Sequence, residues 1–400
     1  MRPIHYYLLG TGSWFLAFGI QGVMFAWLVT MVLRESPEMV GIAQMTLLLP
    51  GTLLILIGGT YADRFGGRRI LVGGQILAAC GPLMLAYFIW SDQLSYSGML
   101  AYAVLMGCAT AFVTPARDGL LNEIAEGRVQ RTVMLASMTQ FGGQMVGITL
   151  AALTDGLGAE WVLGVQSVLL ALGVLAFLAV PPPQAAEAST HAPRLIHLLV
   201  EGAKTVFSSA SMRVIVVQNV AMAMFFMGAY IVTLPLLVRE VFSGSAQDLA
   251  LVNGANSLGL VLTIVVLLRF GDVARPGRAL ILSQGAGALV LAGAGLASSF
   301  SVAVFVLFIW GMCGGIAMTM SRTIMQEQAP EAQRGRVMSF YAFSFMGAGP
   351  LGAVLNGYLV EQMGPQNTLL VTGGAMAVVV LVVRLSSRMW TLAQHQRAAA

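Results

Sequence analysis

The sequence predicts an all-α membrane protein of twelve helices, arranged as two halves of six. The first observation is its composition: of 400 residues, 58% are hydrophobic and only 10% are charged, whereas a soluble domain is about a quarter charged. The mean hydropathy of +0.82 agrees with this. The second is a series of apolar runs, each long enough to cross a bilayer. The third is a sequence repeat between the two halves.

Twelve apolar runs of about 20 residues, the length that spans the hydrocarbon core of a bilayer, lie between polar segments. Their polarity does not alternate, so they predict helices rather than the strands of a barrel. We expect the first run to be retained, because it is too long for a secretory signal and lacks a small-residue cleavage site. The predicted spans lie near residues 8–33, 39–60, 70–90, 96–116, 132–153, 161–180, 214–238, 249–268, 279–297, 301–321, 337–360 and 367–386.

The basic residues predict the orientation. With twelve spans, 19 of the 21 Lys and Arg residues fall on the side of the N-terminus, and only Arg34 and Arg239 fall on the other. Loops rich in Lys and Arg stay in the cytoplasm. We therefore expect a multi-pass protein of the bacterial inner membrane with both termini in the cytoplasm.

A long polar interruption predicts the division into domains. Residues 181–212 separate an N-terminal half, 1–180, from a C-terminal half, 213–400. Apolar residues within this linker recur at helical spacing, which predicts an amphipathic helix at the cytoplasmic interface. These residues are Ile196, Leu199, Val200, Ala203, Val206 and Phe207.

The two halves also match each other in sequence. A shift of 205 positions brings Arg117 onto Arg322, Arg131 onto Arg336, Gly142 onto Gly347 and Gly147 onto Gly352. A parallel repeat of six spans is typical of a class of transporters that bind substrate between their halves near the midplane.

The loop after the second span carries the most specific motif, GGTYADRFGGRR at residues 58–69. It resembles the signature of the major facilitator superfamily, G-x-L-A-D-R-x-G-R-R. Tyr61 and Gly67 depart from that pattern. The residues that fit are Gly59, Ala62, Asp63, Arg64, Gly66, Arg68 and Arg69. A degenerate copy at 269–278 retains Gly271, Asp272 and Arg278.

The resemblance implies a conformational latch on the cytoplasmic side. It places Asp63 beside the amino end of the helix predicted at 337–360, and by symmetry Asp272 beside that at 132–153. An acidic side chain there gains about 0.3 to 1 kcal/mol from the helix dipole. The predicted latch residues are Gly59, Asp63, Arg64, Gly66, Arg68, Arg117, Asp118, Asp272, Arg322 and Arg336. Alternatively, these charges fix only topology and loop shape, and Arg117, Asp118 and Arg322 are interfacial anchors.

Two further segments are similar to the exporter branch that contains enterobactin and macrolide efflux proteins: residues 114–117 and residues 333–350. One departure from the pattern of drug–proton antiporters weakens the interpretation of this chain as such an antiporter. These often carry a glycine-proline motif in the fifth helix, whereas Gly142, Gly143 and Gly147 have no such proline beside them.

The predicted spans hold uncharged polar groups, while all acidic residues and histidines fall in loops or at helix ends. The predicted substrate-binding residues are Gln21, Gln44, Gln140, Gln144, Asn219, Tyr230, Asn253 and Asn256. Aromatic candidates are Trp14, Trp27, Phe225, Phe226 and Trp310, together with many of the 24 methionines. Each amide could instead hydrogen-bond one helix to another. A neutral cavity of this kind predicts a hydrophobic or amphipathic substrate.

The function predicted is secondary active transport of a small amphipathic compound by alternating access, with export of a drug, macrolide or siderophore as the leading hypothesis. A permease or a lipid or lysolipid transporter of the same fold is the alternative, and a non-transporting membrane sensor is the alternative of another class. Expected partners are the substrate, the bilayer and a coupling ion such as H⁺. We expect a monomer that is not an enzyme, with no cofactor, no metal site and no nucleic acid partner; the sequence has no phosphate-binding loop.

Overall fold

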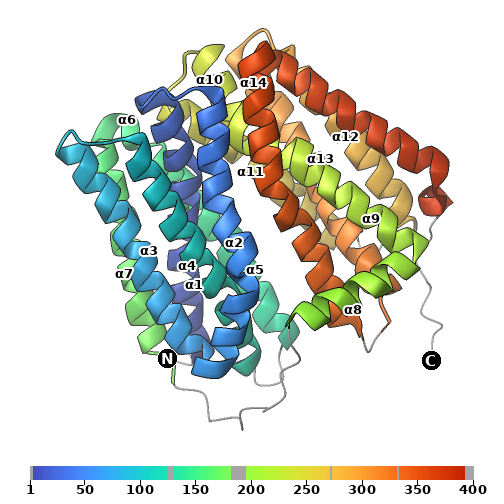
Figure 1. Cartoon of the computed structure of the whole chain (residues 1–400), viewed down its shortest axis with the longest axis horizontal. Coiled ribbons are helices and arrows are strands. Elements are labelled where there is room, and N and C mark those ends of the chain that lie inside the picture. Colours follow the sequence, from blue (N-terminus) through green and yellow to red (C-terminus); the bar gives the residue numbers. More distant parts are fainter. Residues whose placement is uncertain (1–2, 125–128, 182–194, 271–272, 331–332, 392–400) are drawn as a thin grey trace. The chain divides into compact units, whose positions relative to one another are not determined.

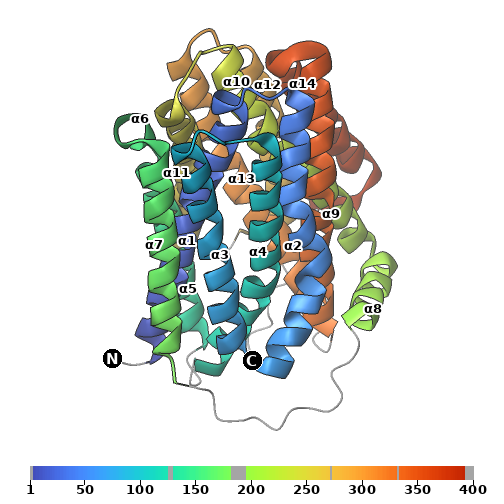
Figure 2. The ribbon, with the colours of Figure 1, turned by 60° about the vertical axis from the view of Figure 1, so that its left-hand side comes forward.

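A computed structural model describes residues 3–124, 129–181, 195–270, 273–330 and 333–391. Every regular element in these ranges is a helix (Figures 1 and 2). The chain divides into two compact units, one made of Met1–Leu195 with Ser243–Leu251, the other of Ile196–Phe242 with Val252–Ala400. The all-α class that the composition predicted is confirmed.

The described helices account for the twelve predicted spans. Ten of them are long and apolar enough to cross a membrane. One of the ten, α14 (Arg334–Ser386), contains two helices, because Gly364 with a φ of 77° interrupts it and Pro365 starts the second. The remaining long helix, α5 (Val129–Ala151), completes the set. A twelve-helix fold of two six-helix halves is therefore confirmed.

The first unit is built around α1, which packs against α5 and α7, while α2 packs against α4, and α3 against both α4 and α7. Its elements are α1 (Pro3–Trp27), the π-helical η1 (Leu28–Val32), α2 (Pro37–Phe65), α3 (Gly67–Trp90), α4 (Tyr96–Ile124), α5, the short α6 (Thr154–Leu157) and α7 (Ala159–Leu178). The segment Ser243–Leu251 also belongs to this unit. Within it, the backbone N–H of Gln247 donates to Oδ2 of Asp155 over 2.9 Å.

In the second unit, α12 packs against α13 and α14, and α14 also packs against α9 and the π-helical segments that follow it. The elements are α8 (Leu195–Ser208), α9 (Ala210–Ala221), η2 (Met222–Met227), η3 (Ala229–Thr233), α10 (Leu234–Glu240), α11 (Ala246–Phe270), α12 (Pro276–Gly295), α13 (Phe300–Gln328), α14 and the 3₁₀ turn η5 (Arg388–Thr391). Together α9 to α10 form one apolar span, and the first residues of α11, up to Leu251, belong to the first unit.

The linker between the halves is described only in its second part. Residues 182–194 lie outside the described ranges, and α8 follows them. Val206 is buried, whereas Val200 is exposed, so α8 has one face against the protein and an apolar residue away from it. The domain boundaries predicted at 181 and 212 stay a prediction.

The motif after the second span forms a very short turn. α2 ends at Phe65 and α3 begins at Gly67, so Gly66 alone separates the two helices. Its φ is 85°, in the region that only glycine enters without steric cost. This explains why the motif needs a glycine at this position.

The sequence repeat has a counterpart in helix packing. In the first unit, Gly147 of α5 lies so close to the carbonyl of Leu16 in α1 that an added Cβ would overlap it. In the second, a Cβ on Gly352 of α14 would lie 2.5 Å from the carbonyl oxygen of Ala223 in η2. The matched glycines thus allow the first and fifth helices of each half to touch backbone to backbone.

Candidate substrate site and conformational latch

The buried polar side chains of both units are uncharged. Those among the described residues are Thr, Ser, Gln and Asn, and no Asp, Glu, Lys, Arg or His with a described side chain is buried. Burying an isolated charge in an apolar interior costs far more than burying a hydrogen-bonded amide. A ligand bound among these helices would therefore meet hydrogen-bonding dipoles and apolar surface.

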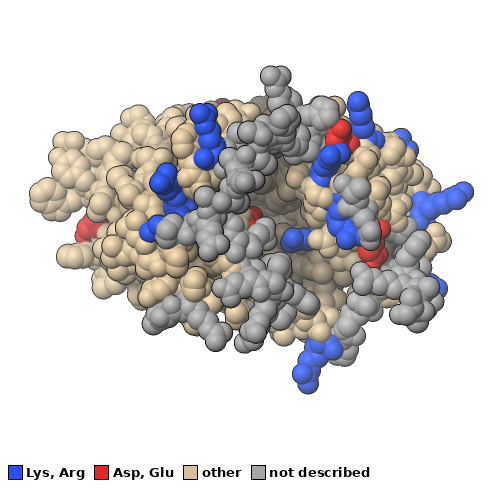
Figure 3. Space-filling model, turned by 90° about the horizontal axis from the view of Figure 1, so that it is seen from below, with Lys and Arg blue, Asp and Glu red and all other residues tan. Residues whose placement is uncertain are grey.

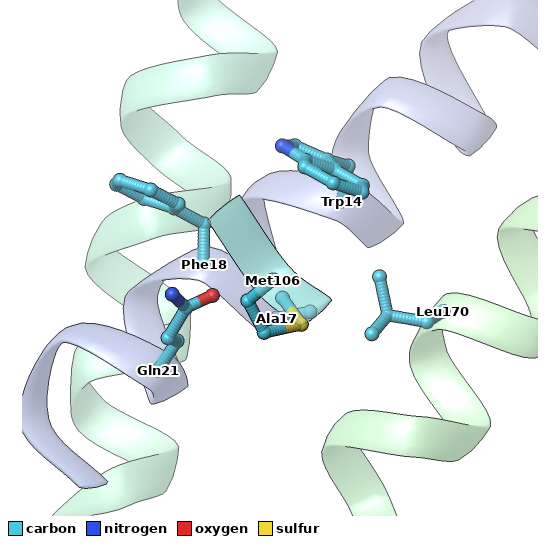
Figure 4. A pocket seen from close by; sticks show the side chains of 6 residues that line it. All are labelled: Trp14, Ala17, Phe18, Gln21, Met106 and Leu170. Carbon is cyan, nitrogen blue, oxygen red and sulfur yellow. The ribbon is translucent and has the colours of Figure 1, made fainter. Parts of the chain in front are cut away.

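A small pocket in the first unit contains two of the predicted groups. Trp14 and Gln21 come from α1, Met106 from α4 and Leu170 from α7, and their side chains surround a common gap (Figure 4). The gap between these side chains leaves no cavity that a water molecule could enter, whereas a pocket that encloses a drug-sized ligand has about 300 to 1,000 Å³. In this structure the gap is therefore closed to such a ligand.

Four predicted glutamines of the first unit make no hydrogen bond through their side chains to any described residue. Gln21 and Gln44 are 5% and 6% exposed, and Gln140 and Gln144 are half-buried on consecutive turns of α5. None of their amide atoms is among the fully enclosed polar atoms that lack a partner. These amides are therefore free to bind a ligand or water.

The amides of the second unit differ in this respect. Asn219 donates to the carbonyl oxygen of Tyr341 over 3.1 Å and to Oγ of Ser344 over 2.9 Å. Asn256 donates to the carbonyl oxygen of Leu307 over 3.3 Å. Both therefore hydrogen-bond one helix to another. Asn253 is buried, with no such bond within the described ranges.

Other buried amides, which the sequence analysis did not single out, also join helices. Gln75 donates to Oγ of Ser13 over 3.0 Å, and Gln218 donates to Oε1 of Gln284 over 2.6 Å. Gln166 of α7 donates to the carbonyl oxygen of Ala17 in α1 over 3.1 Å. No local pattern separates these glutamines from Gln21 or Gln44, because the partner lies on a distant helix.

An aromatic cluster lies beside the π-helical segments of the second unit. We define it as Phe226, Tyr230 and Trp310. The ring of Trp310 lies 5.5 Å from Phe226 and 6.3 Å from Tyr230, between centroids. Trp310 is 5% exposed, and its buried Nε1–H has no acceptor among the described residues.

The π-helical geometry shapes this cluster. η2 and η3 follow one another between Met222 and Thr233, and π-helical turns are frequent at functional sites. Asn356 of α14 supports them, donating to the carbonyl oxygen of Met224 over 2.9 Å and accepting from Oγ1 of Thr233 over 3.0 Å. Phe226 and Tyr230 are thereby held at positions that a regular α-helix would not give them.

Within the first unit, the arginines predicted for the latch contact neighbouring helices. Arg68 donates to the carbonyl oxygen of Phe177 over 3.1 Å and to that of Leu178, at the carboxyl end of α7. Arg64 is exposed, with its guanidinium 5.4 Å from the ring centroid of Phe65. Gly59 lies in the last turns of α2. The Asp63 side chain lies outside the described parts of the structure.

Arg117 is the most deeply placed of these cations. Its side chain is 12% exposed, its guanidinium lies 4.7 Å from the ring centroid of Phe15, and Nε lies 3.4 Å from Oδ1 of Asp118. The hydroxyl of Tyr7 donates to its carbonyl oxygen over 3.3 Å. Asp118 is 67% exposed, so this ion pair is weak and the stacking on Phe15 fixes the guanidinium.

Replacing Arg68 by alanine is expected to lower the free energy of unfolding by about 1 kcal/mol, because it removes the cation from the carbonyls that end α7. Thermal unfolding of the purified protein, followed by tryptophan fluorescence, measures this. Arg69→Ala is the matched control, since Arg69 is exposed and has no described side-chain partner. Equal midpoints for the two variants would contradict the role of Arg68.

In the second unit, the predicted latch residue Arg336 binds the linker helix. Its Nη1 lies 2.5 Å from Oε2 of Glu201 in α8. Thr205 of α8 donates to Oε1 of Gln333 over 2.5 Å, and Phe207 packs edge-on against Phe340, with centroids 6.0 Å apart. α8 is thus docked on the first turns of α14.

The two other predicted latch residues of this unit, Arg322 and Asp272, have no described ion pair. Arg322 is exposed near the end of α13. Asp272 lies outside the described residues. Figure 3 shows the end of the molecule seen from below, where Lys and Arg side chains stand on the surface. The predicted latch as a whole stays a prediction.

Comparison with known proteins gives one family. A model of the Major Facilitator Superfamily matches residues 7–349 and 216–394. The enterobactin exporter EntS of Citrobacter koseri is 24% identical over 346 residues, which cover 83% of this chain and 79% of that protein. The multidrug efflux pump Tap of Mycobacterium bovis is 24% identical over 374 residues, which cover 88% and 85%.

Solved structures agree in fold. The nucleoside transporter NupG superposes with a TM-score of 0.75 at 13% identity, over 98% of this chain and 100% of that one. An auto-inhibited peptide transporter of the POT family superposes with a TM-score of 0.74 at 14% identity, over 100% and 99%. At these identities the likeness concerns the fold alone.

Proposed function

Because this chain belongs to the major facilitator superfamily, and is therefore a multi-pass membrane transporter, we propose that it exports a small amphipathic compound by secondary active transport. The single observation that carries the substrate class is the neutral interior: every buried polar side chain described is an amide or a hydroxyl. A charged substrate would leave its charge without a counter-charge there.

The available contacts fit a compound with an apolar body and a few hydrogen-bonding groups. The free amides of Gln21, Gln44, Gln140 and Gln144 supply donors and acceptors in the first unit. In the second, the aromatic cluster supplies apolar area, and Trp310 supplies one donor that lacks an acceptor among the described residues. Asn253 adds another amide. A small-molecule site usually has a mainly apolar lining with a few polar groups.

Export is favoured over import by the relatives. An enterobactin exporter and a multidrug efflux pump each align with more than four fifths of this chain. Energy comes from an ion gradient in this proposal, with H⁺ as the first ion to test. The described interior holds no buried carboxylate to carry a proton, so the titrating group is expected at a helix end or on the substrate.

Alternating access follows from the repeat in this proposal. The two six-helix halves rock against each other, and the motif at residues 58–69 closes the cytoplasmic side when the site opens outward. Both termini then lie on the cytoplasmic side of the inner membrane, as the distribution of Lys and Arg favours.

The proposal is tested by retention of a compound panel in bacteria that lack their own pumps. The panel contains dyes, macrolides, siderophores, sugars and lysolipids, each measured with and without a protonophore. Lower retention of one amphipathic class, restored by the protonophore, is the expected result. Lower retention of lysolipids alone would instead support the lipid-transport alternative, and retention equal to that of empty vector throughout would contradict broad export.

Asp63→Asn is expected to reduce this export by up to about fivefold, because the neutral amide loses most of the attraction of a carboxylate for a helix amino end, about 1 kcal/mol at most. Asp92→Asn is the matched control: Asp92 is an exposed acidic residue in the loop after α3. Both variants should reach the membrane in equal amounts. Full export by Asp63→Asn would show that the motif does not act as a latch.

A further inference from the structure

Two arginines lie against one tryptophan at the end of the second unit. The guanidinium carbon of Arg384, near the end of α14, lies 4.2 Å from the ring centroid of Trp390. That of Arg278, in the first turn of α12, lies 4.8 Å from the same centroid. Trp390 belongs to η5, which packs against both helices. The turn therefore holds two like charges close together.

Among the described residues, no carboxylate pairs with either arginine. Ion pairs such as Arg117–Asp118, Arg239–Glu240 and Arg336–Glu201 involve other cations. Contact with the π-face of an indole stabilises each cation by about 0.5 to 1 kcal/mol at an exposed site, but it does not neutralise the charge. An anion at this place would relieve the repulsion between Arg278 and Arg384.

The start of α12 adds to the positive potential. Its N-cap residue, Arg275, makes no side-chain cap hydrogen bond, and Pro276 occupies the first turn. The backbone N–H groups of Gly277 and Arg278, at the amino end of this 20-residue helix, have no acceptor among the described residues. Free amides and the helix dipole together favour a bound anion, above all a phosphate.

The neighbouring surface is apolar. Leu282, one turn along α12 from Arg278, is 53% exposed. Leu381 and Leu385 of α14 are 57% and 76% exposed on either side of Arg384. Both helices are long and apolar enough to cross a membrane. Arginines and an amphipathic tryptophan at the end of such helices, beside exposed leucines, combine a phosphate site with a surface for acyl chains.

We propose that Arg278, Arg384 and Trp390 bind the headgroup phosphate of an anionic phospholipid, whose acyl chains lie along the exposed leucines of α12 and α14. The site shares no residue with the predicted substrate groups or with the motif at residues 58–69. Its occupant is a lipid rather than a soluble phosphate, because the exposed leucines continue from the basic groups.

The test measures lipid binding to the purified protein in detergent by native mass spectrometry. Phosphatidylglycerol, phosphatidylcholine and the water-soluble glycerophosphoglycerol are titrated in turn. The variant is Arg278→Gln with Arg384→Gln, and its matched control is Arg213→Gln with Arg269→Gln, which removes the same charge from two other exposed arginines of this unit. Arg278→Lys with Arg384→Lys tests whether charge alone suffices.

We expect the wild type and the control to bind phosphatidylglycerol with equal affinity, and the glutamine variant to bind it about tenfold more weakly. The affinity of the lysine variant should lie between those of the wild type and the glutamine variant. Its unfolding midpoint should equal that of the wild type, which would show that the weaker binding does not come from loss of folding. Equal binding by the glutamine variant and the control would overturn the site. Equal binding of phosphatidylcholine would overturn the preference for anionic lipid, and equal binding of glycerophosphoglycerol would overturn the assignment to a lipid.

Discussion

We expect Gly147→Val to prevent the transporter from folding. Gly352→Val, in the other half, should have the same effect. Each glycine lies where its helix touches a neighbouring backbone: a Cβ on Gly147 would overlap the carbonyl of Leu16, and one on Gly352 would lie 2.5 Å from that of Ala223. Backbone cannot yield as a flexible side chain can, so the helices must separate. Overpacking typically costs about 1 to 3 kcal/mol, and we expect at least the upper end here.

The measurement is the yield of monodisperse protein after extraction, followed by the unfolding midpoint of whatever is recovered. Gly142→Val is the control in the same helix, because nothing lies within 4 Å of the Cβ it would add. The control should behave as wild type. A Gly147→Val protein that is recovered at the control's yield and midpoint would contradict the close backbone packing of α1 and α5.

Trp310→Phe is expected to lower substrate affinity about tenfold while leaving stability nearly unchanged. Phenylalanine keeps an aromatic ring beside Phe226 and Tyr230 but removes the buried Nε1–H, which has no acceptor among the described residues. An unsatisfied buried donor costs about 1 to 3 kcal/mol, and this relief offsets the loss of indole packing. If the substrate supplies the missing acceptor, the variant should lose substrate affinity without losing stability.

Affinity is read from the substrate concentration that gives half-maximal transport, and stability from the unfolding midpoint. Trp161→Phe is the matched control, because Trp161 is 69% exposed. Unchanged transport by Trp310→Phe would exclude Nε1 from the binding site. A large fall in the midpoint would indicate that Trp310 acts in packing.

The helices were predictable from sequence because each depends on a local property, a run of apolar residues about as long as the bilayer is thick. The ends of the helices were less predictable. α2 continues to Phe65, α4 to Ile124 and α13 to Gln328, beyond the predicted limits of 60, 116 and 321. A helix satisfies its own backbone hydrogen bonds wherever it extends, so hydropathy alone understates its length.

The site was predictable only in part, since it depends on contacts between distant segments. Gln21 and Gln166 are both buried glutamines of the first unit, yet only Gln166 donates to another helix within the described residues. The π-helical turns from Met222 to Thr233 are supported by Asn356, more than a hundred residues further along the chain. The pairing of Arg336 with Glu201 likewise joins two segments that no local pattern connects.

Gradient-driven export is tested most directly in inside-out membrane vesicles from cells that make this protein. A compound identified in the retention panel is added outside, and its accumulation is followed while a proton gradient, acidic inside, is imposed. We expect accumulation that requires both the protein and the gradient and that collapses when an uncoupler is added. Accumulation equal to that of vesicles without the protein, or unaffected by the uncoupler, would contradict it.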